Sequence, residues 1–305
     1  MHPIARSFEK PVRSRFTMKY GFVFPWGDAR TASEFAREAE NAGWDGFFVW
    51  EGVYAEDAWV MLAACAMTTT KIRIGTLLTP PSRRRPHKLA SETSSIDRLS
   101  NGRLILSVGL GAPHEGSGWE EFGEIIDRKT RAERMDESLE ILTRLWQSEP
   151  FEYNGKHFRA RAPIFSQPPP PVQKPRIPIW VVGAVNREKS LRRVLKYDGL
   201  LPTLVAEKGE TTPEVSASFT PEQLRAAVDW IRARRKASGA NETPLDVIVE
   251  NQTPGDDAAR AREIIKPYAD AGATWHIESL WDTMGAADGQ QQVLRRLRQG
   301  PPQVD

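Results

Sequence analysis

The feature that most constrains the fold is a regular alternation of short apolar runs with longer segments of helical spacing. The apolar runs predict strands at 20–24, 46–50, 72–78, 104–109, 179–183, 199–203, 245–249 and 274–278. The intervening segments predict helices at 31–42, 57–69, 87–100, 130–147, 186–197, 221–238, 256–271 and 287–298. Eight strand–helix units favour a closed (β/α)8 TIM barrel of the α/β class. An open doubly wound sheet is the alternative.

One stretch, residues 97–111, shows how a single unit is built. Asn101-Gly102 provides the left-handed backbone that ends a helix. The run 104–108 that follows is apolar throughout, as expected for a strand covered on both faces. Gly109 and Gly111 come next, where a backbone can approach a ligand closely.

Helix ends and one core stripe support the same alternation. Thr31 or Ser33 is expected to cap the first helix, with Gly43 just past its end. Thr220 is expected to cap the helix that begins at Pro221. One face of the helix at 130–147 carries a stripe at helical spacing, formed by Met135, Leu139, Leu142 and Trp146.

Between the fourth and fifth units the pattern is interrupted. Residues 151–158 predict a hairpin with Asn154-Gly155 at its turn. A proline-rich passage at 167–175 follows, which we interpret as an extended surface connection rather than an interdomain linker. We therefore expect an N-terminal extension at 1–17 and a single barrel domain at 18–305.

Composition narrows the class of protein. The chain has 305 residues, with 42 basic and 40 acidic side chains and a net charge of +2, so neither nucleic acid nor an anionic membrane is an expected partner. No run approaches the roughly 18 apolar residues of a membrane span. The single cysteine, Cys65, lies in an apolar helical stretch and is expected in the core of a cytoplasmic protein.

Several kinds of chemistry find no support in the sequence. The five histidines show no metal-binding spacing, so we expect no metal site. A Gly-x-Ser-x-Gly elbow and a Walker loop are both missing. Tryptophans lie at or near predicted strand ends instead, and they suit a planar aromatic cofactor: Trp26, Trp50, Trp275 and Trp281. The segment 183–186, just before a helix, either holds a phosphate or is a tight turn that lets the helix pack.

Motifs over residues 19–280 occur in an order that matches a known family. They include Ala39-Glu40-x-x-Gly43-Trp44-Asp45, Asp97-x-Leu99-Ser100-x-Gly102-Arg103, Tyr153-x-Gly155-x-x-Phe158 and Ala271-Gly272-Ala273-Thr274. With these motifs the chain resembles the bacterial luciferase-like oxidoreductases, which include FMN monooxygenases and coenzyme F420-dependent enzymes.

The resemblance implies where FMN or F420 would bind. It implies ring support from a bulge at Leu77, Leu78 and Thr79, a bulge that often carries a non-prolyl cis peptide. It also implies contacts near Gly109 and Gly111 and phosphate binding around Gly183, Ala184 and Val185. Trp26 and Glu51 would flank the substrate, and Trp26, Trp50 and Trp275 would shape its pocket.

The chain also departs from F420-dependent dehydrogenases of that family. Glu51-Gly52 stands where several carry Asp-His, and Ala112 replaces their glutamate. We therefore name His114 and Glu51 as candidate catalytic residues, with an exposed loop histidine as the alternative for His114. His276 faces either the barrel interior or the helices.

The leading hypothesis is a flavin- or F420-dependent oxidoreductase acting on a small organic substrate, by hydride transfer or by oxygenation with O2. A non-catalytic flavin-binding protein and a barrel enzyme without flavin are the alternatives. A flavin or F420 reductase and a second copy of the chain are the expected partners. Residues 111–129 and 204–219 are candidate lids, and Arg83 to Arg85 meet either an anionic cofactor tail or solvent.

Overall fold

Eight parallel strands close into a barrel in the computed structural model of the protein, which describes residues 18–162, 167–206, 218–239 and 244–302. The barrel strands are β1 Lys19–Phe24, β2 Gly46–Val49, β3 Arg73–Thr79, β4 Leu104–Val108, β7 Ile179–Ala184, β8 Gly199–Thr203, β9 Asp246–Asn251 and β10 Trp275–Ser279. Each predicted strand overlaps one of these, and β10 pairs with β1 to close the ring. The predicted TIM barrel is confirmed, and the open sheet is wrong.

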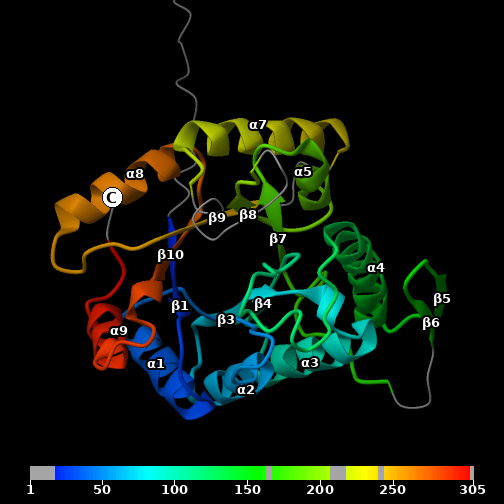
Figure 1. Ribbon diagram of the computed structural model, residues 1–305, viewed down its shortest axis with the longest axis horizontal. Coiled ribbons are helices and arrows are strands. Elements are labelled where there is room, and N and C mark those ends of the chain that lie inside the picture. The colour runs from blue at the N-terminus through cyan, green and yellow to red at the C-terminus, as the bar shows by residue number, and fades with distance from the viewer. Residues whose placement is uncertain (1–17, 163–166, 207–217, 240–243, 303–305) are drawn as a thin grey trace, which may run out of the picture.

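Helices surround the barrel (Figure 1). They are α1 Ala29–Asn41, α2 Ala58–Thr68, α3 Pro86–Leu99, α4 Arg128–Gln147, α5 Glu188–Val194, α7 Pro221–Ala237, α8 Ala258–Asp270 and α9 Gly289–Arg298, with 3-10 turns η1 Pro81–Arg83 and η2 Trp281–Thr283. The stripe predicted on α4 is buried at all four positions. The extension predicted at 1–17 lies outside the described residues, as does much of the loop at 204–219.

The predicted hairpin is present and runs further than expected. Strands β5 Phe151–Asn154 and β6 Arg159–Ala162 pair antiparallel outside the barrel, so β4 takes β7 as its barrel neighbour. The proline-rich passage after it is anchored to α3 at Asp97. The Asp97 carboxylate accepts hydrogen bonds from the backbone N–H of Val172 at 2.7 Å and from the Gln173 side-chain amide at 2.7 Å.

Two apolar cores follow from the alternation of side chains along the strands. The barrel interior holds one cluster, with Val23, Phe48, Ile105, Trp180, Ile248, Trp275 and Ile277 among its members. The larger cluster lies between the strands and the surrounding helices. Cys65 belongs to this outer cluster, and burial raises the pKa of its thiol to about 12.

The helix predicted at 186–197 is shorter in the structure, where α5 spans Glu188–Val194, and the predicted helix caps agree with the structure except at the start of α1. The helix begins at Ala29 because the Asp28 side chain accepts a hydrogen bond from the backbone N–H of Thr31 at 2.8 Å. Asp28 is therefore the cap, and the expectation of Thr31 or Ser33 is wrong. Thr220 forms a capping box at α7, and Asn101 takes the left-handed φ of 55° predicted after α3.

A buried ion pair fastens α9 to the outer face of β10. Glu278 is fully buried, and its carboxylate accepts hydrogen bonds from Arg296 Nη2 at 2.8 Å and from the backbone N–H of Thr253 at 2.6 Å. Arg296 also donates to the carbonyls of Thr253 and Gly300. His276, on the same strand face, is buried with Nε2 3.6 Å from Glu278 Oε2, so it points toward the helices.

Two further results concern membranes and metal ions. None of the helices in the described part of the chain combines the length and the apolar character needed to span a bilayer. Among the same residues, no group of three or more His, Cys, Asp and Glu side chains is arranged to hold a metal ion.

Candidate active site

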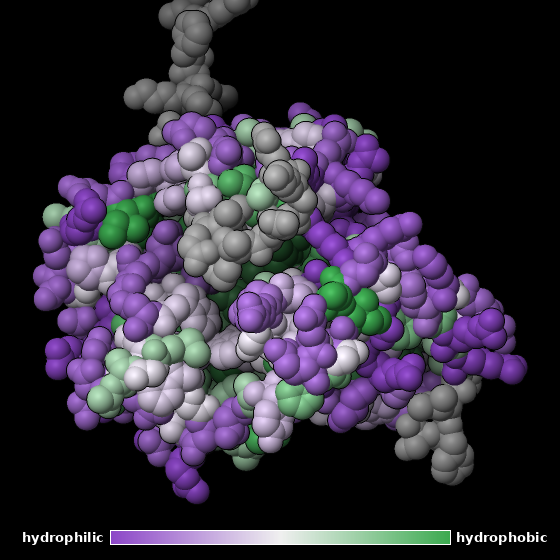
Figure 2. Space-filling view, viewed as in Figure 1, coloured by the Kyte–Doolittle hydropathy of each residue, from purple (hydrophilic) through white to green (hydrophobic). Residues whose placement is uncertain are grey.

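The carboxyl ends of the barrel strands form a mouth that we define by Trp50, Ser107, Glu250, Ser279 and Trp281. In barrels of this kind this end carries the chemistry. On the face drawn in Figure 2 hydrophilic residues predominate, and apolar residues appear in a few patches, one of them in the hollow near the centre of the view. The rings of Trp50 and Trp281 meet edge to face with centroids 6.3 Å apart, and the indole N–H of Trp281 donates to Glu250 Oε1.

A bulge in β3 forms the opposite wall. Pairing with β4 shifts register between Thr76 and Thr79, and the Leu77–Leu78 peptide bond is cis, as the resemblance implied. Leu77 belongs to the interior cluster. A Cβ on Gly109 would lie 3.0 Å from Leu78 Cδ2, so the glycine allows the bulge to sit against β4. The predicted cofactor-binding residues at 77–79 and at 109 therefore lie together.

Glu51 lies behind this wall, where it forms an ion pair with Arg84. Its carboxylate accepts hydrogen bonds from Thr79 Oγ1 at 2.9 Å and from Arg84 Nη1 at 2.9 Å, and its side chain is 7% exposed. Arg84 also pairs with Glu92. Burial lowers the pKa of the Arg84 guanidinium, but the two carboxylates outweigh burial and leave that pKa above its usual value. Glu51 is thus bound into an internal ion-pair network.

The three arginines that follow β3 differ in their surroundings. Arg83 donates to the backbone carbonyls of Glu51 and Gly52, with the Gly52 contact at 2.7 Å. Arg84 has the carboxylate partners just described, and Arg85 is exposed at the N-terminus of α3. The sequence left open whether these arginines meet an anionic cofactor tail or solvent. Of the three, only Arg85 is exposed enough to meet either.

The loop after β4 carries Gly111 and His114. Gly111 has a φ of 74°, and a Cβ there would lie 2.4 Å from the Trp119 ring. Arg131 donates to the carbonyls of Leu110 and Gly111 at 2.7 and 2.9 Å, which holds the start of the loop. His114 is exposed, and its polar contacts are with Glu115 and Ser117 of its own loop.

The turn after β7 is built tightly around Gly183. A Cβ on Gly183 would lie 2.5 Å from Leu200 and 3.1 Å from Val194, so the glycine lets α5 pack on the strand. The backbone N–H of Ala184 donates to Ser190 Oγ, and that of Val185 donates to the Thr203 carbonyl. These two N–H groups have internal partners, so side chains near the turn are the better source of donors for a phosphate.

Such side chains form an arginine cluster, which we define by Arg128, Arg131, Arg187 and Arg193. Arg128 and Arg131 lie in the first turn of α4, Arg187 lies in the turn after β7, and Arg193 lies in the last turn of α5. Partial burial and the charges of Arg187 and Arg193 lower the pKa of Arg128. Burial, and then Arg128, lower the pKa of Arg131 to about 10. Asp136 pairs with Arg193 at 2.6 Å, so the positive potential that favours an anion comes mainly from Arg128, Arg131 and Arg187.

The remaining tryptophans predicted for the pocket lie in different places. Trp26 follows β1 near the start of α9, and its buried indole N–H has no hydrogen-bond partner. Trp275 is the first residue of β10 and packs against Phe48 and Trp180, with Lys19 over its ring. The structure therefore places Trp275 at the amino-terminal end of the barrel interior, away from the mouth.

These residues fit a flavin or deazaflavin. Ser107 Oγ and Trp26 Nε1 are buried without a hydrogen-bond partner, and a polar ring edge would satisfy such atoms. Ser107 shares the interior face of β4 with Ile105. The arginine cluster suits the phosphate that both cofactors carry, and the bulge and tryptophans provide apolar surface for a ring.

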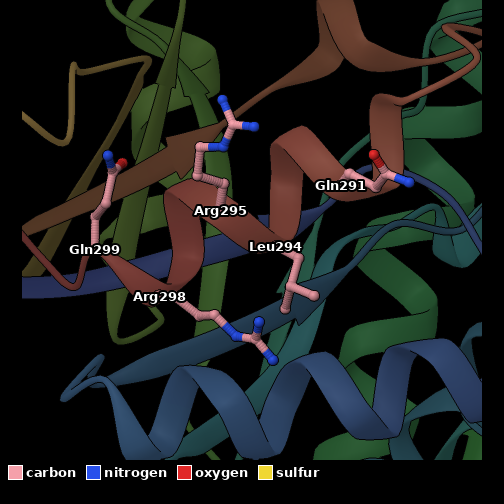
Figure 3. A pocket seen from close by; sticks show the side chains of 5 residues that line it. All are labelled: Gln291, Leu294, Arg295, Arg298 and Gln299. Carbon is pink, nitrogen blue, oxygen red and sulfur yellow. The ribbon is translucent and has the colours of Figure 1, made fainter.

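A depression on the outer surface of α9 is a separate feature (Figure 3). It is lined by Gln291, Leu294, Arg295, Arg298 and Gln299. Arg298 turns from it toward α1, where it pairs with Glu38 at 2.8 Å. With a single apolar side chain and no group of reactive residues, this depression is ordinary surface.

Comparison with known proteins identifies the family. A family model described as luciferase-like monooxygenase matches residues 17–300, and the chain belongs to this family. An F420-dependent glucose-6-phosphate dehydrogenase of Amycolatopsis mediterranei is 29% identical over 297 residues, covering 80% of this chain and 86% of that protein.

Two solved structures share the fold. Monooxygenase RslO1 from Streptomyces bottropensis has a TM-score of 0.74 at 20% identity, covering 92% of this chain and 97% of that one. Coenzyme F420-dependent tetrahydromethanopterin reductase from Methanopyrus kandleri has a TM-score of 0.70 at 16% identity, covering 94% and 99%. The comparisons confirm the predicted luciferase-like oxidoreductase and the prediction that its cofactor is either F420 or FMN.

Proposed function

We propose that this protein uses F420 to transfer hydride to a carbonyl or unsaturated group of a small organic substrate. The arginine cluster carries this proposal, because it supplies positive charge for an anionic cofactor beside the mouth. The F420-dependent relative from Amycolatopsis supports F420 over FMN. When bound, the reduced cofactor supplies the hydride.

The chain's own residues would bind the cofactor, orient the substrate and exclude water. We propose that Leu77 and Leu78 support the ring, while Ser107 Oγ bonds to one of its polar edges. Trp50 and Trp281 would cover the substrate on the other side, since their rings stand together at the mouth. Tryptophan rings over the substrate would keep solvent from the reduced cofactor.

The roles of the two predicted catalytic residues remain proposals. For Glu51 we propose positioning, because its contacts with Thr79 and Arg84 tie the bulge to the loop after β2. His114 stays a candidate for proton transfer from the loop at 111–129. Replacing His114 with Gln should lower the rate in that case, and an unchanged rate would leave it as an exposed loop residue.

The arginine cluster allows a test that separates phosphate binding from ring binding. Arg128→Gln and Arg187→Gln should each weaken FMN and F420 while leaving riboflavin, which lacks the phosphate, unchanged. Arg192→Gln on α5 is the matched control, because Arg192 is exposed and pairs with Glu188. Equal losses for FMN and riboflavin would refute the proposed phosphate site. Binding without turnover of any carbonyl or unsaturated compound would favour the non-catalytic flavin-binding protein.

We also propose a homodimer formed through α2. This helix is apolar on all sides, yet Val60 and Met67 are 58% and 70% exposed. A helix without a polar face needs a second surface to cover it. Val60→Asp with Met67→Asp should shift sedimentation to a monomer, while Val172→Asp, at an exposed apolar position elsewhere, should not. A monomeric wild-type protein would contradict this interface.

Two further expectations complete the proposal. A separate flavin or F420 reductase would return the cofactor to its reduced state. The only cysteine is buried and unpaired, which is consistent with a cytoplasmic location.

A further inference from the structure

Glu250 is a mouth residue that the sequence analysis did not select. It lies in β9 opposite Ile277 of β10. Ile248 and Ile277 belong to the interior cluster, and side chains two residues apart on a strand share a face. Glu250 therefore faces the barrel interior one step above Ile248, at the mouth, where Trp281 Nε1 donates to its carboxyl group.

Glu250 is half-buried, and its surroundings differ from those of the carboxylates of Glu51 and Glu278. Glu51 has Arg84 and Glu278 has Arg296, whereas no Lys, Arg or His of the described residues forms an ion pair with Glu250. Burial raises the pKa of Glu250, and hydrogen bonds from Trp281 and Ser279 offset only part of that rise. A carboxyl group in this setting retains its proton to higher pH than usual.

The other acidic residues on β9 and β10 lie elsewhere and have their own partners. On β9, Asp246 lies at the other end of the barrel, where it accepts a hydrogen bond from Trp180 Nε1 at 3.1 Å. On β10, Glu278 points away from the interior to Arg296. On the packed neighbours of the Glu250 carboxyl, the polar groups facing it are the side chains of Ser279 and Trp281.

We infer that Glu250 is the acid that protonates the substrate when hydride is transferred at the mouth. The inference rests on the proposed function. Hydride from the reduced cofactor forms the new C–H bond, the carbonyl π electrons move to oxygen, and that oxygen takes the Glu250 proton to become a hydroxyl. The Glu250 carboxylate that remains would be reprotonated from water, and the oxidised product would be the cofactor that supplied the hydride. Trp281 is a positioning residue in this scheme, because its indole N–H orients the carboxyl group.

The first test needs no cofactor. Infrared difference spectra of the full chain, wild type minus Glu250→Gln, should show a protonated carboxylic acid that persists above the pH of about 4.3 at which an ordinary glutamate titrates. Glu263→Gln, at an exposed position on α8, is the matched control and should leave the band in place. Absence of the band above that pH overturns the inference.

The second test uses turnover with reduced F420 and a panel of simple aldehydes, ketones and enones. Glu250→Gln should lower kcat by about 100-fold or more while cofactor affinity stays within about twofold, and Glu250→Asp should recover part of the rate. The wild-type rate should fall as pH rises through the pKa of Glu250, and the Gln variant should lose this dependence. Normal turnover by Glu250→Gln refutes the inference alone. Failure of the protein to bind either cofactor, or to reduce any member of the panel, refutes the proposed function as well.

Discussion

The ion pair between Glu278 and Arg296 should dominate the stability of the β10–α9 unit, which ends beside the mouth. Replacing Glu278 with Ala removes the carboxylate that faces Arg296 Nη2 at 2.8 Å and leaves that guanidinium buried beside β10. The Thr253 N–H and hydroxyl lose their acceptor in the same step. Breaking a buried pair by removing one partner costs about 3–5 kcal/mol. We therefore expect Glu278→Ala to lower the free energy of unfolding by about that amount.

Urea unfolding followed by tryptophan fluorescence measures this loss. A double-mutant cycle with Arg296→Met isolates the pair, because the double variant removes both charges together. Replacing both partners by apolar groups is often close to neutral, so the double variant should be more stable than Glu278→Ala alone. A loss below about 1 kcal/mol for Glu278→Ala, or single losses that simply add, would refute the reasoning.

Two further predictions concern pH and packing. The Glu40 carboxylate accepts hydrogen bonds from the backbone N–H groups of Thr70, Lys71 and Ile72. Burial raises the pKa of Glu40, but these bonds outweigh burial and lower it. The stabilisation is therefore present above the unfolded pKa of about 4.3 and is lost as pH falls through the lower folded pKa. Glu40→Gln should cost about 1–3 kcal/mol at neutral pH and flatten the acid limb of a stability profile, and an unchanged limb would contradict this assignment. Gly109→Ala would place a Cβ 2.8 Å from Val182 and 3.0 Å from Leu78. We expect the free energy of unfolding to fall by about 1–3 kcal/mol and cofactor binding to weaken, as measured by urea unfolding and by cofactor titration. Full stability would show that the bulge has room to move.

The barrel could be predicted because its determinants are local. Parallel strands buried on both faces appear as short apolar runs, and helix ends carry their own markers, such as Asn101 after α3 and Thr220 before α7. The cap of α1 was missed because Asp28, Thr31 and Ser33 all suit that role. Only the backbone geometry shows that the Asp28 side chain accepts the Thr31 N–H.

The site was harder to predict because it depends on contacts distant in sequence. The ion pair of Glu51 with Arg84 and the approach of Arg128 to Arg187 join different strand–helix units. One signal was nevertheless present. Alternation from Ile248 places Glu250 on the interior face once β9 is known to extend to Asn251, two residues past the predicted strand. Trp275, at the very start of β10, belongs by the same logic to the opposite end of the barrel.

Equilibrium titration of the purified protein with F420 and, separately, with FMN tests the central claim most directly. Cofactor fluorescence should report saturable F420 binding at one site per chain, weakened by Arg128→Gln, with FMN bound more weakly. Tight binding of FMN alone would redirect the assignment to FMN chemistry. Binding of neither cofactor would contradict the account, whatever the barrel shares with its relatives.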